Sequence, residues 1–354
     1  MTATPTNTIS KDDTESETLA PRGPAISYGA DYTLDTLAQY VKNKDIEVQP
    51  GFQRKEVWDK NKASKLIESF LFGYPVPNIL LGRPQNGDKM EVIDGQQRIL
   101  AISGFLRGTF KDSVFRLIGD IAPQYYNKSF DELDEADQRR LKNSVLKATI
   151  LVYQDEEPDL KFSVFQRINT GSVVLTQQEI RNCIYGGSLN DLLHSLNMET
   201  LWRDFLSKKP DSRMRDEEAI LRFFAAYFNR QKYEKPMTKF LNDFMRSNKN
   251  IDEGKAEAWR DLFLDALRII KDNYTGKNPF TVTADNKQLN RAAFEAIMVA
   301  VATLARNGKD DFSDFNSKHS SLAADPEFRE TVSTGTADTK KYAQRFELAL
   351  SQLA

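Results

Sequence analysis

Strand-forming segments are confined to the first part of this 354-residue chain, and this most limits how it can fold. Short apolar runs at 78–81, 90–93 and 148–153 are typical of strands. Residues 123–147 predict a polar helical excursion. Beyond residue 175, the long segments, such as 188–206, 216–230 and 255–273, have helical spacing of apolar residues. This asymmetry predicts an α+β fold: a small mixed α/β half followed by an all-helical half.

Composition suggests the domain boundaries. Residues 1–26 are rich in Thr, Ser, Pro and acidic side chains and contain few apolar ones, so we expect a disordered tail there. We expect a first domain over 27–175 and a helical domain over 176–354. Thr176 and Glu179 have the spacing of a capping box, which predicts that a helix begins between them.

Composition also restricts the chemistry. The one cysteine, Cys183, excludes a disulfide within the chain and a cysteine zinc site. Two histidines, His194 and His319, leave little room for a histidine metal site or a Ser-His-Asp triad, and His194 lies among leucines, which favours a structural role. The net charge of −2 means that the overall charge of the protein does not favour nucleic-acid binding.

No apolar run approaches the roughly 20 residues that a membrane span needs. The first residues are polar and do not resemble a signal peptide. We therefore expect a cytoplasmic protein without a membrane partner.

The segment 91–100, Glu-Val-Ile-Asp-Gly-Gln-Gln-Arg-Ile-Leu, predicts a strand, a tight turn and the start of a helix. Such a turn aims backbone N–H groups at one point, which suits an anion such as phosphate. Gly95 permits close approach, Arg98 can grip phosphate through two parallel hydrogen bonds, and Asp94 can hold Mg²⁺ or orient a water. In the simpler alternative, Asp94 caps the helix and Arg98 pairs with a surface carboxylate.

Three further polar clusters lie at expected element boundaries, where rigid elements present functional groups. They are Gln53 and Arg54 with Trp58, the segment 166–171, and Glu179 with Arg181 and Asn182. If these arginines and amides converge with the 94–98 turn, they form a pocket for a polyanion that carries a base. The chain has no Walker lysine motif, so nucleotide chemistry here would not be of the P-loop type.

Taken together, these motifs resemble a known family. The residues that carry the resemblance are 52–54 (Phe-Gln-Arg), Trp58, 62–69, 75–77 (Pro-Val-Pro), 93–98 (Ile-Asp-Gly-Gln-Gln-Arg), 165–171 (Phe-Gln-Arg-Ile-Asn-Thr-Gly), Leu175, 178–182 (Gln-Glu-Ile-Arg-Asn), 216–218, 221–223 and 294–296. They are similar to the N-terminal domain of GmrSD-type modification-dependent restriction enzymes, and the similarity extends over about residues 30–350.

The resemblance implies a core like that of ParB and sulfiredoxin, which binds a nucleoside triphosphate with Mg²⁺. ParB has Gly-Glu-Arg-Arg where this chain has Gly95, Gln96, Gln97 and Arg98, so one carboxylate and one arginine are replaced by glutamines. In the restriction family the Asp-Gly-Gln-Gln-Arg form is associated with nucleotide hydrolysis. By that resemblance Asp94 is the catalytic metal- or water-positioning group and Arg98 is the phosphate clamp.

The same resemblance suggests nucleotide contacts at Arg54, Arg167 and Asn169, and DNA contacts at Gln53, Arg54 and Arg181. Many relatives carry an HNH nuclease domain. Because this chain ends near its last expected helix, and because we expect His319 in a polar loop without the HNH pattern, we expect that nuclease to be a separately encoded partner.

Three functions remain open. The first is an NTP-binding, Mg²⁺-dependent NTP-hydrolysing regulatory component of a bacterial DNA restriction or anti-phage system. The second is a metal-dependent nuclease of ParB-like type. The argument against it is that Glu91 and Asp94 would point to opposite faces of a regular strand. The third is a non-catalytic module whose Gln and Arg side chains bind DNA. We favour the first.

Overall fold

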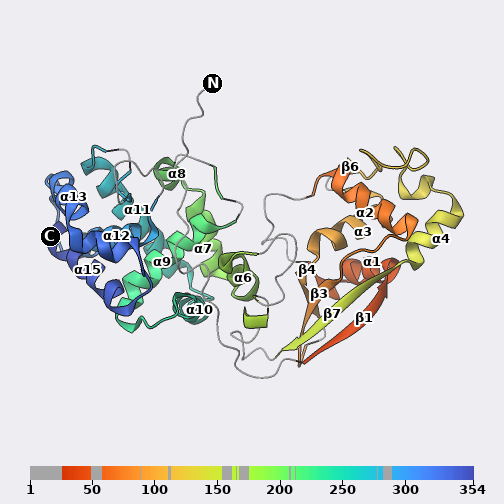
Figure 1. Ribbon diagram of the computed structural model, residues 1–354, viewed down its shortest axis with the longest axis horizontal. Helices are drawn as coiled ribbons and strands as arrows, with labels where there is room; N and C mark the ends of the chain where they lie inside the picture. The colour runs from red at the N-terminus through yellow and green to blue at the C-terminus, as the bar shows by residue number, and fades with distance from the viewer. Residues whose placement is uncertain are drawn as a thin grey trace. The chain divides into compact units, whose positions relative to one another are not determined.

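The computed structural model describes residues 26–48, 58–87, 89–110, 113–153, 162–164, 166, 175–206, 209–211, 213–276, 278–281 and 289–354. These residues form two compact units, 26–164 and 166–354, which we call the α/β unit and the helical unit (Figure 1). Their contents confirm the α+β fold class. Residues 1–25 of the expected tail lie outside the described residues, whereas Ile26 already belongs to a strand.

The elements of the α/β unit follow one another as strands and short helices. The first six are β1 (Ile26–Thr33), α1 (Leu34–Asn43), β2 (Ile46–Glu47), α2 (Lys60–Phe72), β3 (Ile79–Pro84) and β4 (Met90–Asp94). The others are α3 (Gln96–Leu106), β5 (Thr109–Phe110), β6 (Ser113–Val114), the 3₁₀ helix η3 (Phe130–Glu132), α4 (Glu135–Asn143) and β7 (Val145–Tyr153).

Five of the described strands form one sheet in the order β1-β7-β3-β4-β2. β1 runs antiparallel to β7, β7 is parallel to β3, β3 is antiparallel to β4, and β4 is parallel to β2. Figure 1 shows α1, α2 and α3 along one side of this sheet. Buried side chains of these helices share one apolar core with alternate residues of β3 and β7, such as Leu81 and Ile150, so this side of the sheet is the helix face.

Local sequence explains why α1 and α2 start and end where they do. Thr33 and Asp59 cap them, each accepting a hydrogen bond from a first-turn N–H. α2 ends at Gly73, whose φ of 72° lies in the left-handed region that glycine adopts without strain.

Two expectations about this unit need correction. β1 was not expected, because Gly29 and Asp31 are poor strand formers, yet all eight of its residues pair with β7. The expected helical excursion over 123–147 is an α-helix only in α4, and β7 already begins at Val145.

The helical unit contains the remaining elements. They are α6 (Gln177–Ile184), α7 (Ser188–Asn197), α8 (Thr200–Leu206), α9 (Arg215–Asn229), the 3₁₀ helix η4 (Arg230–Lys232), α10 (Met237–Ser247), α11 (Glu253–Asn273), α12 (Arg291–Arg306), α13 (Phe315–Ala324), α14 (Pro326–Ser333) and α15 (Thr339–Leu353). The helix expected over 188–206 is divided into α7 and α8, and α12 packs against α9, α11 and α15.

A chain of buried ion pairs joins α6, α9, α12 and α15. Arg181 pairs with Glu218 (3.1 Å), Glu218 with Arg222 (3.2 Å), Arg222 with Glu295 (3.1 Å), and Glu295 with Arg345 (2.7 Å). The side chains of all five are at most 9% exposed. Alternating charges therefore compensate one another where water does not reach them.

Three smaller expectations can be compared with the structure. The capping box of Thr176 and Glu179 is confirmed at the start of α6. His319 lies in α13, buried and 2.7 Å from the Pro279 carbonyl, so the prediction that it occupies a polar loop is wrong. Throughout the described ranges, every helix is too short or too polar to cross a bilayer.

Candidate functional site

The junction between β4 and α3 has the predicted strand–turn–helix form. β4 ends at Asp94, Gly95 has φ 95° and ψ 11°, and α3 begins at Gln96. A Cβ on Gly95 would lie 2.3 Å from Cγ2 of Ile79, so both the backbone conformation and the packing require glycine. Since no side chain caps α3, the alternative in which Asp94 is the helix cap is wrong. The first-turn N–H groups of such a helix face outward without partners within the helix.

Asp94 and Arg98 face each other across this turn. Nη2 of Arg98 lies 2.8 Å from Oδ2 of Asp94, and Nη1 donates to the Pro77 carbonyl at 3.2 Å. The Arg98 side chain is 13% exposed and the Asp94 side chain is 67% exposed. The guanidinium is thus held by two acceptors, while the carboxylate lies open to solvent. The simpler alternative predicted that Arg98 pairs with a surface carboxylate. Arg98 does form such a pair, and the carboxylate is that of Asp94.

A β-bulge changes the relation between Glu91 and Asp94. Opposite β3, Glu91 pairs with Gly82 and Asp94 with Leu80, and the register shifts between these two pairs. Since Leu80 and Gly82 are two residues apart on one strand, both carboxylates lie on the same face of the sheet, unlike in a regular strand. The Glu91 carboxylate accepts a hydrogen bond from the Tyr153 hydroxyl at 2.8 Å.

The two glutamines of the turn begin α3 and are half-buried. Oε1 of Gln97 accepts a hydrogen bond from the backbone N–H of Trp58 at 3.2 Å. This bond joins Trp58 to the turn. In the sequence, Trp58 belongs to the same predicted polar cluster as Gln53 and Arg54. Both of those residues lie outside the described residues, as do Arg167 and Asn169.

Arg181, the third residue predicted to contact DNA, is fully buried in the helical unit. Its guanidinium donates to Asn242 (3.0 Å), Gln178 (3.1 Å), Glu218 (3.1 Å) and Gln177 (3.1 Å). Burial lowers the pKa of this guanidinium, and Glu218 acts in the opposite direction. DNA cannot reach Arg181 in this structure, and the residue holds α6 to α9 and α10.

A cavity of about 430 Å³ borders α3 one turn beyond the glutamines. Its lining consists of Val41, Lys44, Ile46, Glu47, Val48, Lys89 and Leu100. Leu100 follows Gln96 by four residues and therefore lies on the same side of α3 as that glutamine. Sequence reasoning missed this cavity, because its walls come from separate elements: α1, β2, α3 and the residue before β4.

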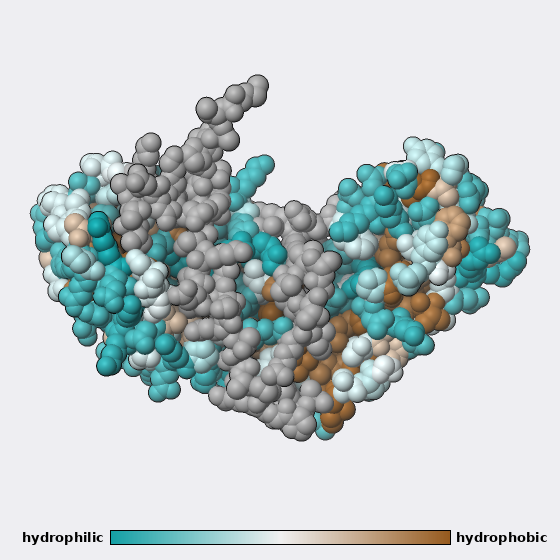
Figure 2. All heavy atoms as spheres, viewed as in Figure 1, coloured by the Kyte–Doolittle hydropathy of each residue, from teal (hydrophilic) through white to brown (hydrophobic). Residues whose placement is uncertain are grey.

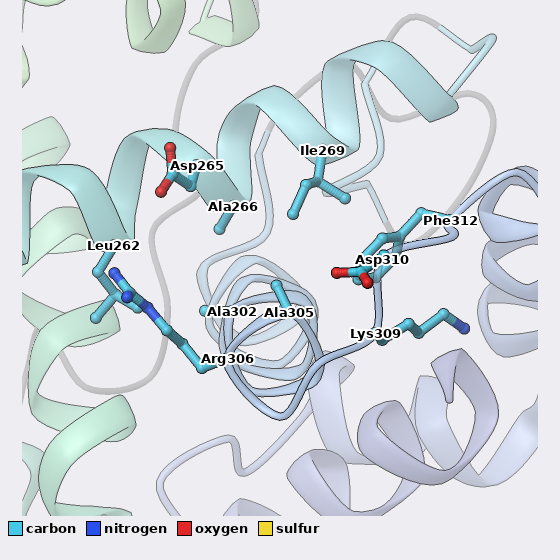
Figure 3. Close-up of a pocket in the computed structure, with 10 residues that line it drawn as sticks. All are labelled: Leu262, Asp265, Ala266, Ile269, Ala302, Ala305, Arg306, Lys309, Asp310 and Phe312. Carbon is cyan, nitrogen blue, oxygen red and sulfur yellow. The ribbon is translucent and has the colours of Figure 1, made fainter.

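A second cavity, of about 310 Å³, lies in the helical unit between α11 and α12 (Figure 3). Its floor is made by Ala266, Ala302 and Ala305, and charged side chains including Asp265, Arg306 and Asp310 surround it. None of the predicted site residues lines it.

The donors present set a limit on any metal ion. In the parts of the chain that the structure describes, no three His, Cys, Asp or Glu side chains gather as a metal-binding group. Asp94 offers a single exposed carboxylate. Mg²⁺ commonly binds through one or two carboxylates together with substrate phosphates and waters, so Asp94 fits this ion only as part of a metal–nucleotide complex.

The fold and this site define a class of protein: a mixed α/β unit that presents an uncapped strand–turn–helix junction beside a clamped arginine, followed by a helical unit. Residues 37–186 match the family model described as GmrSD restriction endonuclease, N-terminal domain. This match supports the GmrSD N-terminal domain family for the segment 37–186, as the motif resemblance implied. The chain matches none of the curated proteins.

Proposed function

We propose that the α/β unit binds a nucleoside triphosphate with its phosphates at the 94–98 turn. The observation that carries this proposal is the pairing of an uncapped helix start at Gly95 with the fixed guanidinium of Arg98. The helix dipole and first-turn N–H groups favour an anion at this point. Arg98 adds a planar donor whose geometry suits phosphate oxygens.

Asp94 would hold Mg²⁺ together with the phosphates, and the ion would neutralise part of their charge. The exposed carboxylate also stands where it could position a water for hydrolysis. As the phosphates approach, the Arg98 guanidinium would be shared between them and Asp94.

We place the nucleoside in the cavity beside α3, which lies on the same side of that helix as Gln96. Its volume of about 430 Å³ falls within the usual range for small-ligand sites. Val41, Ile46, Val48 and Leu100 give it apolar walls that suit a base, and its charged side chains are two lysines, Lys44 and Lys89, and one carboxylate, Glu47.

We further propose that the protein is a regulatory component of a bacterial DNA restriction or anti-phage system, with a separately encoded nuclease and DNA as its partners. The family description of residues 37–186 supports this assignment. In a phage plaque assay, cells that carry the native locus should lose protection when Arg98→Gln is introduced. Full protection with that variant would contradict a role for the turn in defence.

Calorimetric titration of the full chain with each NTP and Mg²⁺ tests the binding site. Arg98→Gln should weaken binding about tenfold or more, because a charge-assisted hydrogen bond contributes about 1.5–3 kcal/mol. Arg139→Gln is the matched control, since Arg139 also pairs with a carboxylate four residues earlier, at 3.1 Å from Glu135. No NTP binding by the wild type, or equal affinity in Arg98→Gln, overturns the proposal.

Phosphate release separates hydrolysis from binding alone. We expect Asp94→Ala to lose hydrolysis, and a variant with full activity would contradict the role given to Asp94. Cleavage of plasmid DNA with Mg²⁺ and without nucleotide would instead favour the nuclease alternative.

A further inference from the structure

Among the residues that the structure describes, β1 forms an open edge of the sheet. Within these residues it pairs with β7 on one side only, and the strand order places it at the end of the sheet, where Figure 1 shows it outermost. The exposed apolar side chains include Ile26 (65%) and Tyr28 (42%). Figure 2 shows apolar residues, in brown, gathered along the region of β1 and β7. Main-chain N–H and C=O groups on the outer side of such a strand are available to another strand.

The usual protection of a free edge is missing from β1. Its eight residues include no lysine, arginine or proline, and the single charge is Asp31. The register with β7 continues from Ile26 to Thr33 without a bulge. Natural proteins commonly blunt long exposed edges with such charges, prolines or bulges, so an unprotected edge of this length is typical of a docking strand.

Side-chain parity selects the partner and the register. Ala30 and Tyr32 pack toward the helix face, so Ile26 and Tyr28 share that face and Ser27, Gly29 and Asp31 take the other. When two copies are related by a two-fold axis perpendicular to the sheet, residues opposite each other point to the same face. An even-numbered residue of β1 therefore pairs with an even-numbered one, and an odd-numbered residue with an odd-numbered one. With the axis at Gly29, Ile26 lies opposite the second copy's Tyr32.

In this register Ser27 lies opposite the second copy's Asp31, and both pairs occur twice because of the symmetry. The serine hydroxyl can donate to the carboxylate, and no two like charges face each other. Shifting the axis to Ala30 would place Asp31 opposite Gly29, where the carboxylate finds no side-chain donor. Of these two registers, the one centred on Gly29 is therefore the better self-complementary pairing.

We propose that β1 pairs antiparallel with β1 of a second copy, centred on Gly29, so that one sheet continues through both chains. A single strand pair is smaller than the roughly 1,200–2,000 Å² of a standard stable interface, so the dimer forms in a concentration-dependent way. This assembly does not depend on nucleotide binding.

Sedimentation velocity over a wide range of protein concentrations tests the proposal. The wild type should shift from monomer to dimer, and Tyr28→Lys should stay monomeric because it places a charge on the edge. Val114→Lys is the matched control: this apolar side chain is 58% exposed in β6, outside the five-stranded sheet, and its variant should dimerise like the wild type. Circular dichroism checks that each variant is folded. A wild type that is monomeric throughout, or a dimer unaffected by Tyr28→Lys, overturns the proposal.

Cysteine cross-linking in a Cys183→Ser background tests the register. A side chain at Gly29 has open space, with no atom within 4 Å of an added Cβ. Gly29→Cys should form disulfide-linked dimers on oxidation, because the two cysteines meet at the axis. Asp31→Cys should not, because its two copies stand about 13 Å apart along the strands. Equal cross-linking of both variants, or cross-linking of Asp31→Cys alone, rejects the register.

Discussion

Replacing Glu295 by glutamine should destabilise the helical unit strongly. The Glu295 carboxylate accepts hydrogen bonds from Arg222 at 3.1 Å and Arg345 at 2.7 Å, and all three side chains are at most 3% exposed. Glutamine keeps the shape but removes the charge, and its amide N–H₂ must face one of the two guanidinium groups. If the N–H₂ faces Arg345, that guanidinium keeps its bond to the Thr336 carbonyl, and if it faces Arg222, that guanidinium keeps its bond to Glu218.

Breaking a buried ion pair by neutralising one partner typically costs about 3–5 kcal/mol. Glu295 serves two arginines, so we expect the upper part of this range. For a unit of this size each kcal/mol lowers the Tm by about 2–4 °C, so a loss of about 4–5 kcal/mol gives a decrease of about 8–20 °C. Water cannot offset the loss, because the site is closed to solvent.

Urea denaturation followed by tryptophan fluorescence measures this change. Trp202 and Trp259 are buried in the helical unit, so the signal reports mainly on that unit. Glu135→Gln is the control, because it breaks an exposed pair with Arg139 and should cost less than about 0.5 kcal/mol. If Glu295→Gln costs under about 1 kcal/mol, the buried chain does not hold these helices together and the reasoning fails.

Three further predictions concern single positions. Gly95→Ala should destabilise the α/β unit by more than about 1 kcal/mol, because φ is 95° and the added carbon would lie 2.3 Å from a neighbouring side chain. Gly29→Ala is the control and should be nearly neutral. Thermal melts followed by circular dichroism compare the two variants. Burial lowers the pKa of His319, so the folded state resists protonation. Stability should therefore be complete above about pH 6.5 and fall as the pH drops below it, and in His319→Gln the Tm should change less between about pH 7 and pH 5.5. Thr176→Ala removes the cap of α6 and should cost about 1 kcal/mol in urea denaturation.

Sequence reasoning located the β4–α3 junction, because its signals are local. An apolar strand, a glycine and the start of an amphipathic helix lie within ten residues, and the structure has all three in that order. The capping box of α6 could be predicted for the same reason, since Thr176 and Glu179 are bonded to each other's backbone.

The same reasoning missed contacts between residues far apart in the chain. β1 is a strand because β7, more than a hundred residues later, supplies its hydrogen bonds. The bulge that brings Glu91 and Asp94 to one face depends on pairing with β3, which a strand's own sequence does not reveal. Arg181 lies in a motif that suggested an exposed role, yet its partners on α9 and α10 bury it.

The sequence by itself determined where the turn lies, which residues it carries and which half of the chain is helical, since these follow from backbone preferences over a few neighbours. Only the tertiary structure decided which charges are open and which are buried. Asp94 and Arg181 both looked like site residues, but Asp94 ends the inner strand β4 with its carboxylate in solvent, and Arg181 lies buried between helices. Exposure depends on packing by distant segments, and that packing decides whether a charged side chain can meet a ligand or must be paired within the core.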